Sequence, residues 1–543
     1  MGDFDAIVIG SGFGGTMAAH ELVEAGLSVL MLERGSRVTR GPHNWEPRGS
    51  IDLTPHYSFE SPYRVENNGR TTTIGAYACV GGPSVFYGGV SLRLREADFE
   101  PAPEITGDSG AAWPYRYADL EPYYTRAERL LGVAGETGDD PTEPPRSAPY
   151  PRPAPPLTET PRRLERIGRE MGMRPYSLPL AINYDAHPRP ACVGCTTCDT
   201  FACAISAKND LATGMLPDLI ARGLALRPET IAVRLVTRGR RITAVECVDK
   251  SAGRRIVFKA RLFLLCAGAL GSPHLLMASG LPALNPAGDA IGRYLTRHAN
   301  GMTYACIPDL PDRGRHFHKQ LGFNDYYFGD PGAREVSGKL GSIQQLQAPP
   351  VSLVSANVPL WMKPFARLVG LTFPRVTGLL AMAEDQPRPE NQVTIDRLRP
   401  DGFGLPQLVI RHRHTGRDEA ARRALLRRTR RLLSAAGGRF FYTHHITTFS
   451  HAAGTVRFGL DPKTAPLDPW CRLRGVENLF VVDASFLPTG GGVNPSLTIA
   501  ANALRVGEAI AKDRLPALED PTCRREPRTR LTSRSWAVAS RPS

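Results

Sequence analysis

The sequence has no apolar run long enough to cross a membrane. The longest uninterrupted apolar stretch in its 543 residues is Leu262–Leu270, well below the ~20 residues that span a bilayer. The N-terminus begins Met1-Gly2-Asp3 and lacks both the basic region and the hydrophobic core of a secretory signal. We therefore expect a soluble protein located in the cytoplasm, for which membrane contact is possible but not expected.

Cysteine is also scarce, because the chain has only ten, too few for a disulfide scaffold at this length. Four of them form a cluster, Cys192, Cys195, Cys198 and Cys203. Their spacing resembles the C-x2-C-x2-C-x3-C-P run of iron–sulfur proteins, but the last gap is one residue longer and Ala204 replaces the proline. We predict no bound metal and a loop with reduced thiols or a local disulfide; an iron–sulfur cluster or a zinc ion remains the alternative.

Acidic residues are outnumbered, 53 Asp and Glu against 67 Lys and Arg, which gives a formal charge of +14. Much of this charge lies in two segments that need no partner. Residues 417–436 have the leucine spacing of an amphipathic helix with a solvated arginine face, and residues 513–543 are rich in Arg, Ser and Pro with little to bury. We expect no nucleic-acid partner and a disordered tail over residues 516–543.

Two further segments interrupt the regular structure. Pro141–Pro156 is too dense in proline for a helix or a central strand, which predicts an extended surface connector. The apolar segment Val358–Ala383 is broken by Pro364 and Pro374, so it cannot cross a membrane. We expect it to form a buried pair of helices; the alternatives are the lining of an entrance to the site and contact with a membrane surface.

What the chain does contain is a nucleotide-binding pattern in residues 4–35. The apolar strand Ala6–Ile9 runs into Gly10, Gly12 and Gly15 at G-x-G-x-x-G spacing, and a helix and a second strand follow. The first glycine permits the tight turn, the second lets a pyrophosphate approach the backbone, and the third lets the helix pack on the sheet. Glu33 ends the second strand, where a carboxylate accepts ribose hydroxyls. The motif predicts one adenine dinucleotide but does not by itself choose between FAD and NAD.

Four later segments, taken in order, resemble the glucose–methanol–choline (GMC) oxidoreductases. The first is a glycine-rich loop followed by an arginine-containing strand and Asp98-Phe99. The others resemble the second signature, the histidine segment and the C-terminal flavin segment of that family. The matching residues are 71–99, Cys266–Gly280, His451–Thr455, and Val481–Ser485 with Gly492–Thr498.

The resemblance implies FAD extended through the protein, with its ring between two domains. By position, Gly81, Gly82 and Ser84 are expected against the flavin or its pyrophosphate and Val233 against the adenine. Asp483, Ala484, Asn494 and Thr498 are expected at the ribityl and ring end. Some members of the family attach FAD through a histidine just after the glycine pair. Val85, Phe86 and Tyr87 follow Ser84 here, so we expect non-covalent FAD.

The residues also indicate the chemistry. Oxidising an alcohol requires a base for the hydroxyl proton, and histidine has a pKa suited to that role. His451 is the candidate base, and the amide of Asn494 is the candidate partner that orients the substrate oxygen. The alternatives are a buried structural histidine and an Asx turn before Pro495. His444 and His445 are expected to be supporting or loop residues.

We therefore expect an α/β protein: a Rossmann-like FAD-binding domain built from discontinuous segments, and an α+β substrate domain with an antiparallel sheet. The expected segments are 1–98, 190–298 and 449–515 for the FAD-binding domain, 99–189 for a connector and part of the substrate domain, and 299–448 for the substrate domain.

The predicted activity is oxidation of a CH–OH group to an aldehyde or ketone by an FAD-dependent oxidase or dehydrogenase, with oxygen, a quinone or another electron acceptor. Sequences such as VFYGGVSLRLREADF are similar to bacterial members acting on sugar or aminoglycoside hydroxyls. The alternatives are a sterol or long-chain alcohol as substrate, a flavin-scaffolded lyase, and an electron-transfer module centred on the cysteines.

Overall fold

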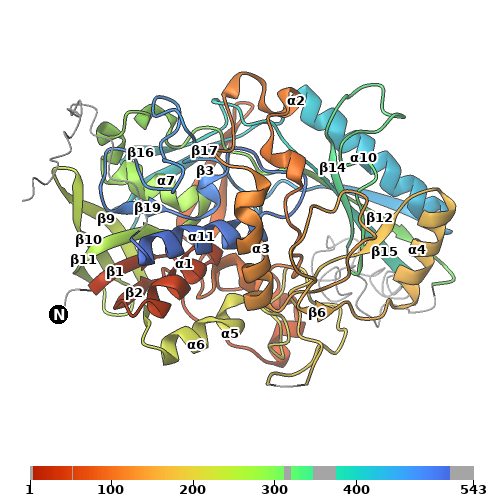
Figure 1. Cartoon of the computed structure of the whole chain (residues 1–543), viewed down its shortest axis with the longest axis horizontal. Helices are drawn as coiled ribbons and strands as arrows, with labels where there is room; N and C mark the ends of the chain where they lie inside the picture. The colour runs from red at the N-terminus through yellow and green to blue at the C-terminus, as the bar shows by residue number, and fades with distance from the viewer. Residues whose placement is uncertain (1–3, 52, 187, 311–318, 347–374, 514–543) are drawn as a thin grey trace, which may run out of the picture.

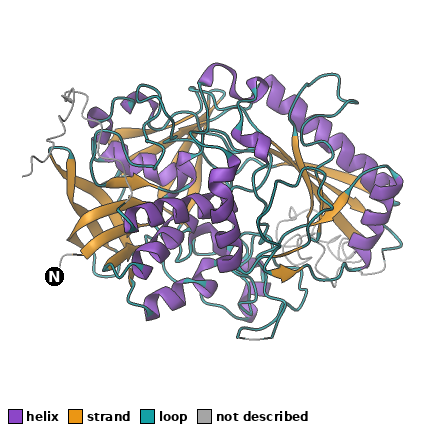
Figure 2. Cartoon of the chain, in the orientation of Figure 1, coloured by secondary structure: helices purple, strands orange, loops and turns teal. Residues whose placement is uncertain are grey.

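A computed structural model describes residues 4–51, 53–186, 188–310, 319–346 and 375–513. A mostly parallel sheet lies at one end of the molecule and an antiparallel sheet at the other, with helices between and outside them (Figures 1 and 2). This arrangement confirms the predicted α/β class with an antiparallel sheet.

The first sheet draws its strands from both ends of the chain. Its parallel part runs in the order β8-β2-β1-β11-β19, and its long strand β11 continues into an antiparallel meander with β10 and β9. Ala6–Ile9 of β1 and all of β2 and β19 are apolar and buried, as strands covered on both faces must be. The bounds are β1 (Phe4–Ile9), β2 (Val29–Leu32), β8 (Ala225–Arg227), β9 (Thr230–Arg238), β10 (Arg241–Asp249), β11 (Arg254–Leu265) and β19 (Leu479–Val481).

Helices from the N- and C-terminal regions pack together on this sheet. The first helix, α1 (Phe13–Glu24), lies against the last, α11 (Ser496–Ala511), and α11 in turn lies against α3 (Tyr117–Leu131) (Figure 1). The contact is close, because a Cβ on Gly507 would lie 3.0 Å from the Cβ of Glu21. The other helices of this half are α5 (Leu211–Gly214), α6 (Leu216–Ala221) and α7 (Gly268–Ala278).

The second large sheet has six antiparallel strands in the order β18-β12-β15-β14-β13-β7. Its outer face is covered by α10 (Gly416–Ala435) and α4 (Glu159–Glu170), which bury leucine and alanine side chains against it (Figure 2). The strands are β7 (Pro175–Ser177), β12 (Ala299–Cys306), β13 (Leu321–Phe323), β14 (Gly341–Leu346), β15 (Val376–Ala383) and β18 (Arg439–His445).

The opposite face of this sheet carries polar and larger apolar groups. The register aligns Asn300, Met382 and Ser342 across β12, β15 and β14, and the next row aligns Met302, Leu380 and Gln344. The alternation of strand side chains puts both rows on the face away from the two helices. This face therefore supplies polar groups next to the C-terminal loop that contains Asn494.

The sequence expectation for one apolar segment was wrong. The end of the apolar segment Val358–Ala383 forms strand β15 and not a helix, because valine, threonine and leucine there pair with buried strands on both sides. Residues 347–374 lie outside the described part of the chain, as does the predicted tail over 516–543. None of the helices in the described residues is both long and apolar enough to cross a bilayer.

Two smaller sheets complete the fold. One joins β16 (Gln392–Pro400), β17 (Pro406–Arg411), β3 (Tyr57–Asn67) and β4 (Arg70–Tyr77). The other pairs β5 (Ala134–Gly135) with β6 (Arg152–Pro153), which fastens the proline-rich connector to the end of α3. The predicted arginine-containing strand after the glycine-rich loop is wrong, because Ser91–Arg95 has no regular secondary structure. A short helix, α2 (Pro103–Thr106), follows it.

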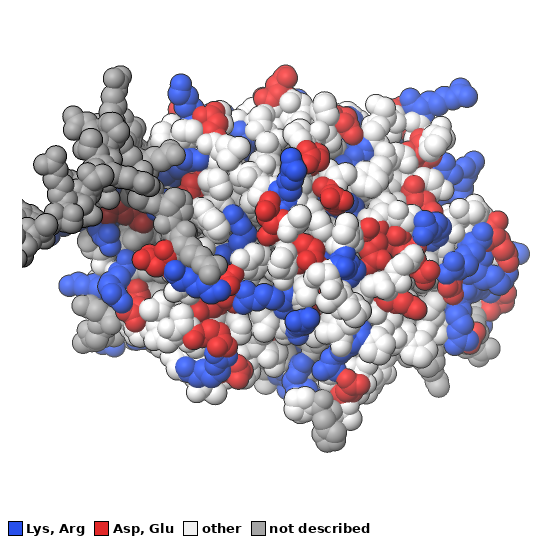
Figure 3. Space-filling view, viewed as in Figure 1, with Lys and Arg blue, Asp and Glu red and all other residues white. Residues whose placement is uncertain are grey.

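The excess of basic residues is spread over the surface and mixed with acidic ones. Lys and Arg gather at the end of the molecule that carries α4 and α10, with acidic side chains among them (Figure 3). Many of these arginines form ion pairs, such as Arg166 with Glu170 and Arg169 with Glu165 on α4. The visible face therefore lacks the single-sign stripe that follows a nucleic-acid backbone.

Candidate active site

The predicted nucleotide turn forms between β1 and α1. Gly10 has φ +108°, and a Cβ there would lie 2.2 Å from the Cys266 carbonyl oxygen, so a side chain is excluded. A Cβ on Gly15 would lie 2.0 Å from the Gly10 carbonyl oxygen. Gly12 differs, because nothing lies within 4 Å of the position of its Cβ. As α1 begins directly after Gly12 with no side-chain cap, this open space meets free backbone N–H groups, as a pyrophosphate requires.

Glu33 is buried at the end of β2 and organises this turn. Its Oε2 accepts hydrogen bonds from the Ser11 N–H (3.1 Å) and Ser11 hydroxyl (2.6 Å), and its Oε1 accepts from the Gly35 N–H (2.8 Å). Burial raises the pKa of this carboxyl. The predicted contact of Glu33 with ribose hydroxyls remains a prediction, and the carboxylate also fixes the loop around the nucleotide site.

The second glycine loop lies directly against the first. The Gly81 N–H donates to the Ser11 hydroxyl (2.9 Å), and a Cβ on Gly82 would lie 3.1 Å from the Gly12 Cα. The buried hydroxyl of Ser84 donates to the Gly81 carbonyl and accepts from the Leu211 N–H. Gly81 and Gly82 are thus brought beside Gly12, whereas the Ser84 hydroxyl is used within the protein.

The C-terminal residues predicted for the flavin are tied to neighbouring loops. Asp483 accepts hydrogen bonds from the Gly268 N–H (2.9 Å) and the Ser485 N–H (2.8 Å). The Ala484 carbonyl accepts from the Gly454 N–H (3.1 Å), and the Thr498 hydroxyl pairs with the Tyr124 hydroxyl (2.8 Å). Asp483 therefore joins its own segment to that of Gly268, and Ala484 joins the same segment to the histidine segment.

Val233 lies on β9, whose first residue, Thr230, donates its N–H to the Glu33 carbonyl (2.8 Å). It packs with Leu405 and lines an open groove of about 280 Å³ whose walls also carry Arg234, Arg255 and Arg397. No hydrogen bond of the described residues joins Val233 to the glycine turn, so its contact with adenine stays a prediction.

His451 is brought against a second histidine that the sequence reasoning missed. His298 Nδ1 lies 3.0 Å from His451 Nδ1, and His298 Nε2 lies 2.8 Å from the Gly491 carbonyl oxygen. A carbonyl only accepts, so His298 Nε2 carries a proton. When each ring holds one proton, His298 Nδ1 is an acceptor and His451 Nδ1 must donate to it. The lone pair of His451 is then on Nε2.

The surroundings of His451 keep its ring neutral. Burial, followed by the proximity of His298 and Lys319, lowers the pKa of His451 to about 3. A neutral imidazole with its lone pair on a defined nitrogen can accept a proton, although a pKa this far below neutral makes it a weaker base than free histidine.

Asn494 is also oriented by a neighbour. The Gln344 Nε2 donates to Asn494 Oδ1 (2.8 Å), which leaves the NH₂ group of Asn494 to donate elsewhere. The Gly491 carbonyl that holds His298 belongs to the same loop. The His451 and Asn494 environments are therefore connected through residues 491–494.

Two further histidines near this segment, His444 and His445, are not part of the pair. His444 and His445 are exposed on the edge strand β18 and do not lie in a loop; a supporting role for them stays a prediction. The feature of the sequence that could have indicated His298 is its position, immediately before β12 and next to the predicted domain boundary between residues 298 and 299. Its left-handed backbone, with φ +61°, leaves no sequence signature.

The cysteine loop holds thiols that are not gathered as the ligands of a single metal ion would be. The nine cysteines of the described residues are thiols, and no three of the sulfurs of Cys192, Cys195, Cys198 and Cys203 lie within 4.8 Å of one another in that part of the chain. Burial raises the pKa of Cys192 to about 11, which favours the protonated thiol over a thiolate ligand. The predicted absence of a metal remains a prediction.

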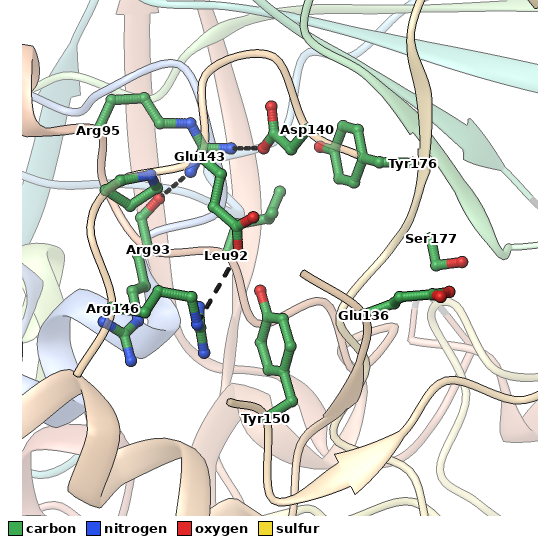
Figure 4. A pocket seen from close by; sticks show the side chains of 11 residues that line it. Leu92, Arg93, Arg95, Glu136, Asp140, Glu143, Arg146, Tyr150, Tyr176 and Ser177 are labelled. Carbon is green, nitrogen blue, oxygen red and sulfur yellow. Dashed lines mark hydrogen bonds and ion pairs between the residues drawn. The ribbon is translucent and has the colours of Figure 1, made fainter. Parts of the chain in front are cut away.

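A recess near Arg93 and Arg95 is filled by protein groups (Figure 4). Arg93 is 1% exposed and donates to both Glu128 carboxylate oxygens (2.8 Å each), while Arg95 donates to Asp140 (2.7 Å). The space left among these side chains is about 10 Å³, room for one water molecule at most. This cluster fastens the connector to the glycine-rich loop and is not a ligand site.

Comparison with known proteins agrees with this geometry. The GMC oxidoreductase family models match residues 164–300 and 387–503, and an NAD(P)-binding Rossmann-like domain model matches residues 8–67. The chain is 33% identical to the 6'''-hydroxyparomomycin C oxidase of Streptomyces lividus, over 94% of this chain and 91% of the relative. It is 32% identical to the paromamine 6'-oxidase of Streptomyces fradiae, over 94% and 92%.

More distant proteins are also similar to this chain over nearly its whole length. The fructose dehydrogenase large subunit of Gluconobacter japonicus is 26% identical over 94% of this chain and 98% of that protein. Among solved structures, pyridoxine 4-oxidase from Mesorbium loti superposes with a TM-score of 0.63 at 22% identity, covering 93% of this chain and 98% of the other.

The residues present suit the cofactor that this family uses. The open space at Gly12, the adjoining Gly82 and the first turn of α1 form a recess for a pyrophosphate, and the histidine pair lies beside the loop of Asn494. The chain belongs to the GMC oxidoreductase family and is an FAD-dependent oxidoreductase.

Proposed function

We propose that this enzyme oxidises a hydroxyl group of a sugar, an aminoglycoside or a related polyol to the carbonyl compound. The observation that carries the proposal is the chain of contacts from the Gly491 carbonyl through His298 to His451, which leaves a lone pair on His451 Nε2. The two oxidases of aminoglycoside-type compounds that resemble this chain over nearly its whole length support the substrate class.

In the proposed reaction, His451 Nε2 takes the proton of the substrate hydroxyl. The Asn494 NH₂ group donates to the substrate oxygen, because its own oxygen is occupied by Gln344. FAD, when bound, supplies the acceptor for the hydride that leaves the carbinol carbon. The C=O bond forms as the O–H and C–H bonds break, and His451 holds the proton at Nε2 until it leaves.

The sheet face beside Asn494 favours a hydroxylated substrate over a sterol or long-chain alcohol. Asn300 Oδ1 and Gln344 Oε1 are buried without a hydrogen-bond partner among the described residues. Leaving such groups unpaired costs about 1–3 kcal/mol each, and a substrate with several hydroxyls would satisfy them. An apolar substrate would leave them unpaired.

The test is anaerobic stopped-flow mixing of the FAD-loaded protein with sugars, aminoglycosides, sterols and fatty alcohols, following loss of the oxidised flavin absorbance. We expect polyols or aminoglycosides to reduce the flavin, and His451→Ala to slow reduction by ~10²–10⁴-fold while FAD stays bound. His43→Ala, at an exposed site remote in sequence, is the control.

Reduction by sterols alone would overturn the substrate class, and unchanged rates in His451→Ala would overturn the assignment of the base. Turnover with the flavin oxidised throughout would indicate a lyase. Reoxidation by oxygen or by a quinone, measured on the reduced enzyme, distinguishes an oxidase from a dehydrogenase.

We also propose a cytoplasmic location. Reducing conditions there would keep the clustered cysteines as the thiols found in the structure. Cell fractionation followed by thiol labelling tests this directly.

A further inference from the structure

The backbone of His298 is held on both sides by buried side chains. Asp385 Oδ1 accepts from the His298 N–H (3.0 Å), and Asp385 Oδ2 accepts from the Arg297 N–H (2.9 Å). On the other side, His414 Nε2 lies 3.2 Å from the His298 carbonyl oxygen. The N–H and the carbonyl of His298 are therefore both held by side chains: Asp385 lies just after β15, and His414 lies just after β17.

This backbone needs support, because its conformation is unfavourable for a residue with a side chain. His298 has φ +61°, in the left-handed region, where a residue other than glycine costs on the order of 1–3 kcal/mol unless its surroundings determine it. The hydrogen bonds from the His298 N–H to Asp385 and from His414 to the His298 carbonyl hold the backbone in this conformation. Without these hydrogen bonds, nothing would hold the backbone in the conformation that directs the imidazole toward His451.

A metal site is the competing explanation for these side chains. Ligand atoms of Asp385, His412 and His414 all lie within 4.8 Å of one another. The positions of the protons on these side chains argue against a metal site. Arg297 Nε donates to His412 Nδ1 (3.1 Å), so His412 Nε2 carries a proton and donates to Asp385 (3.2 Å). His414 Nε2 likewise donates to a carbonyl. Neither nitrogen that faces Asp385 has a lone pair for a cation, and the Arg297 guanidinium lies beside them.

The charges around Asp385 agree with a hydrogen-bonded carboxylate. Burial alone would raise its pKa, but the hydrogen bond from His412 and the proximity of the three histidine rings hold the pKa below its usual range. The titratable and charged groups that face Asp385, His298 and His451 are Arg297, His412, His414, Arg417, Asp418 and Lys319.

We propose that Asp385 and His414 are positioning residues that clamp His298 and thereby determine which nitrogen of His451 faces the substrate. This inference rests on the proposed function of His451. The clamp fixes the backbone, the backbone directs the His298 ring, and the ring forces the proton of His451 onto Nδ1. Free histidine favours the other tautomer, with the proton on Nε2, so the clamp would hold the base in its reactive form.

The test compares His414→Phe, which keeps a ring but no donor, with His414→Gln, whose amide can still donate to the His298 carbonyl. We expect His414→Phe to slow anaerobic flavin reduction by ~10–100-fold and His414→Gln to restore most of the rate. The acid limb of the rate against pH should move to higher pH in His414→Phe, because a released and better hydrated His451 would be protonated more easily. Asp385→Asn should behave as His414→Phe does, and Asp139→Asn, at an exposed carboxylate, is the control.

A second readout does not depend on activity. Histidine-selective ¹⁵N labelling of the holoenzyme reports the tautomer of His451, assigned by its loss in His451→Ala. We expect the Nδ1–H form in the wild type and in His414→Gln, and a shift toward the Nε2–H form in His414→Phe.

Equal rates, pH profiles and tautomers in the Phe and Gln variants would overturn the clamp. If His451→Ala has no effect on flavin reduction, the proposed function fails, whereas the tautomer measurement still decides the clamp. Stoichiometric zinc, iron or manganese in the purified protein that is lost in His412→Ala would overturn the clamp in favour of a metal site.

Discussion

His298 Nδ1 lies 3.0 Å from His451 Nδ1, although 153 residues separate them in the chain. The contact joins the start of the antiparallel sheet to the histidine segment of the FAD-binding region. Because the other nitrogen of His298 is bound to the Gly491 carbonyl, one backbone oxygen determines the proton positions of two rings.

Replacing His298 should therefore affect the rate more than the fold. Asparagine tolerates a left-handed backbone, so His298→Asn should fold, bind FAD and reduce it ~10–100-fold more slowly than the wild type. The measurement is anaerobic stopped-flow reduction alongside the melting temperature. A rate equal to the wild type in a folded variant would show that His451 needs no partner.

Two glycines of the first turn should respond in opposite ways. Gly12→Val places a side chain in open space, so the protein should fold but lose FAD, measured by the flavin-to-protein absorbance ratio. Gly10→Val drives a side chain into the Cys266 carbonyl and should reduce the yield of folded protein. If the Gly12 variant retained full FAD, the pyrophosphate would have to lie elsewhere.

Arg93 should matter for stability and not for chemistry. Arg93→Met leaves Glu128 buried, 1% exposed, without its main cation, which should cost about 3–5 kcal/mol of unfolding free energy. Urea unfolding of wild type and variant measures this, and flavin reduction per folded molecule should be unchanged. A loss smaller than about 1 kcal/mol would mean that Arg146, which also pairs with Glu128, compensates.

Buried neutral histidines should make the protein less stable in acid. Burial lowers the pKa of His274 to about 4, below the ordinary value of 6.5. The unfolded chain therefore binds a proton that the folded one does not between pH 6.5 and 4, so folding free energy is lost as pH falls through that window. Each such histidine contributes up to about 1.4 kcal/mol per pH unit.

The check is the pH dependence of the unfolding free energy in His274→Gln, which should fall less steeply below pH 6.5 than in the wild type. Asp418 acts in the opposite direction, because burial raises its pKa to about 7. As the pH falls, the folded chain takes up this proton before the unfolded chain does, which adds to the folding free energy. Parallel curves for wild type and variant would exclude His274 as a source of the slope.

The cysteine loop should not be needed for flavin reduction. Because burial favours the protonated thiol of Cys192 over a thiolate ligand, purified protein should contain no stoichiometric iron or sulfide. Cys195→Ser should be reduced by substrate and reoxidised by an artificial acceptor at wild-type rates. Iron at one cluster per chain, lost in the variant, would contradict this and restore the electron-transfer alternative.

The local patterns of this chain predicted its fold and its nucleotide turn well. The strand–glycine–helix pattern around Gly10 and Gly12 depends on neighbours in sequence, so it could be recognised without coordinates. The strand at the end of the segment Val358–Ala383 could not be predicted from sequence, because an apolar run is compatible with a helix or a strand until its packing partners are known. The pairing of His298 with His451 depends on contacts between distant residues and on a left-handed backbone, and neither leaves a periodic signal.

The packing of the first helix on the last has a consequence for how the enzyme matures. The strand order β2-β1-β11-β19 and the α1–α11 contact mean that the nucleotide recess is complete only when residues near 500 are in place. A nascent chain cannot retain FAD until almost all of it has left the ribosome. The cofactor should therefore enter after synthesis, and a version shortened at either end should emerge from cells colourless.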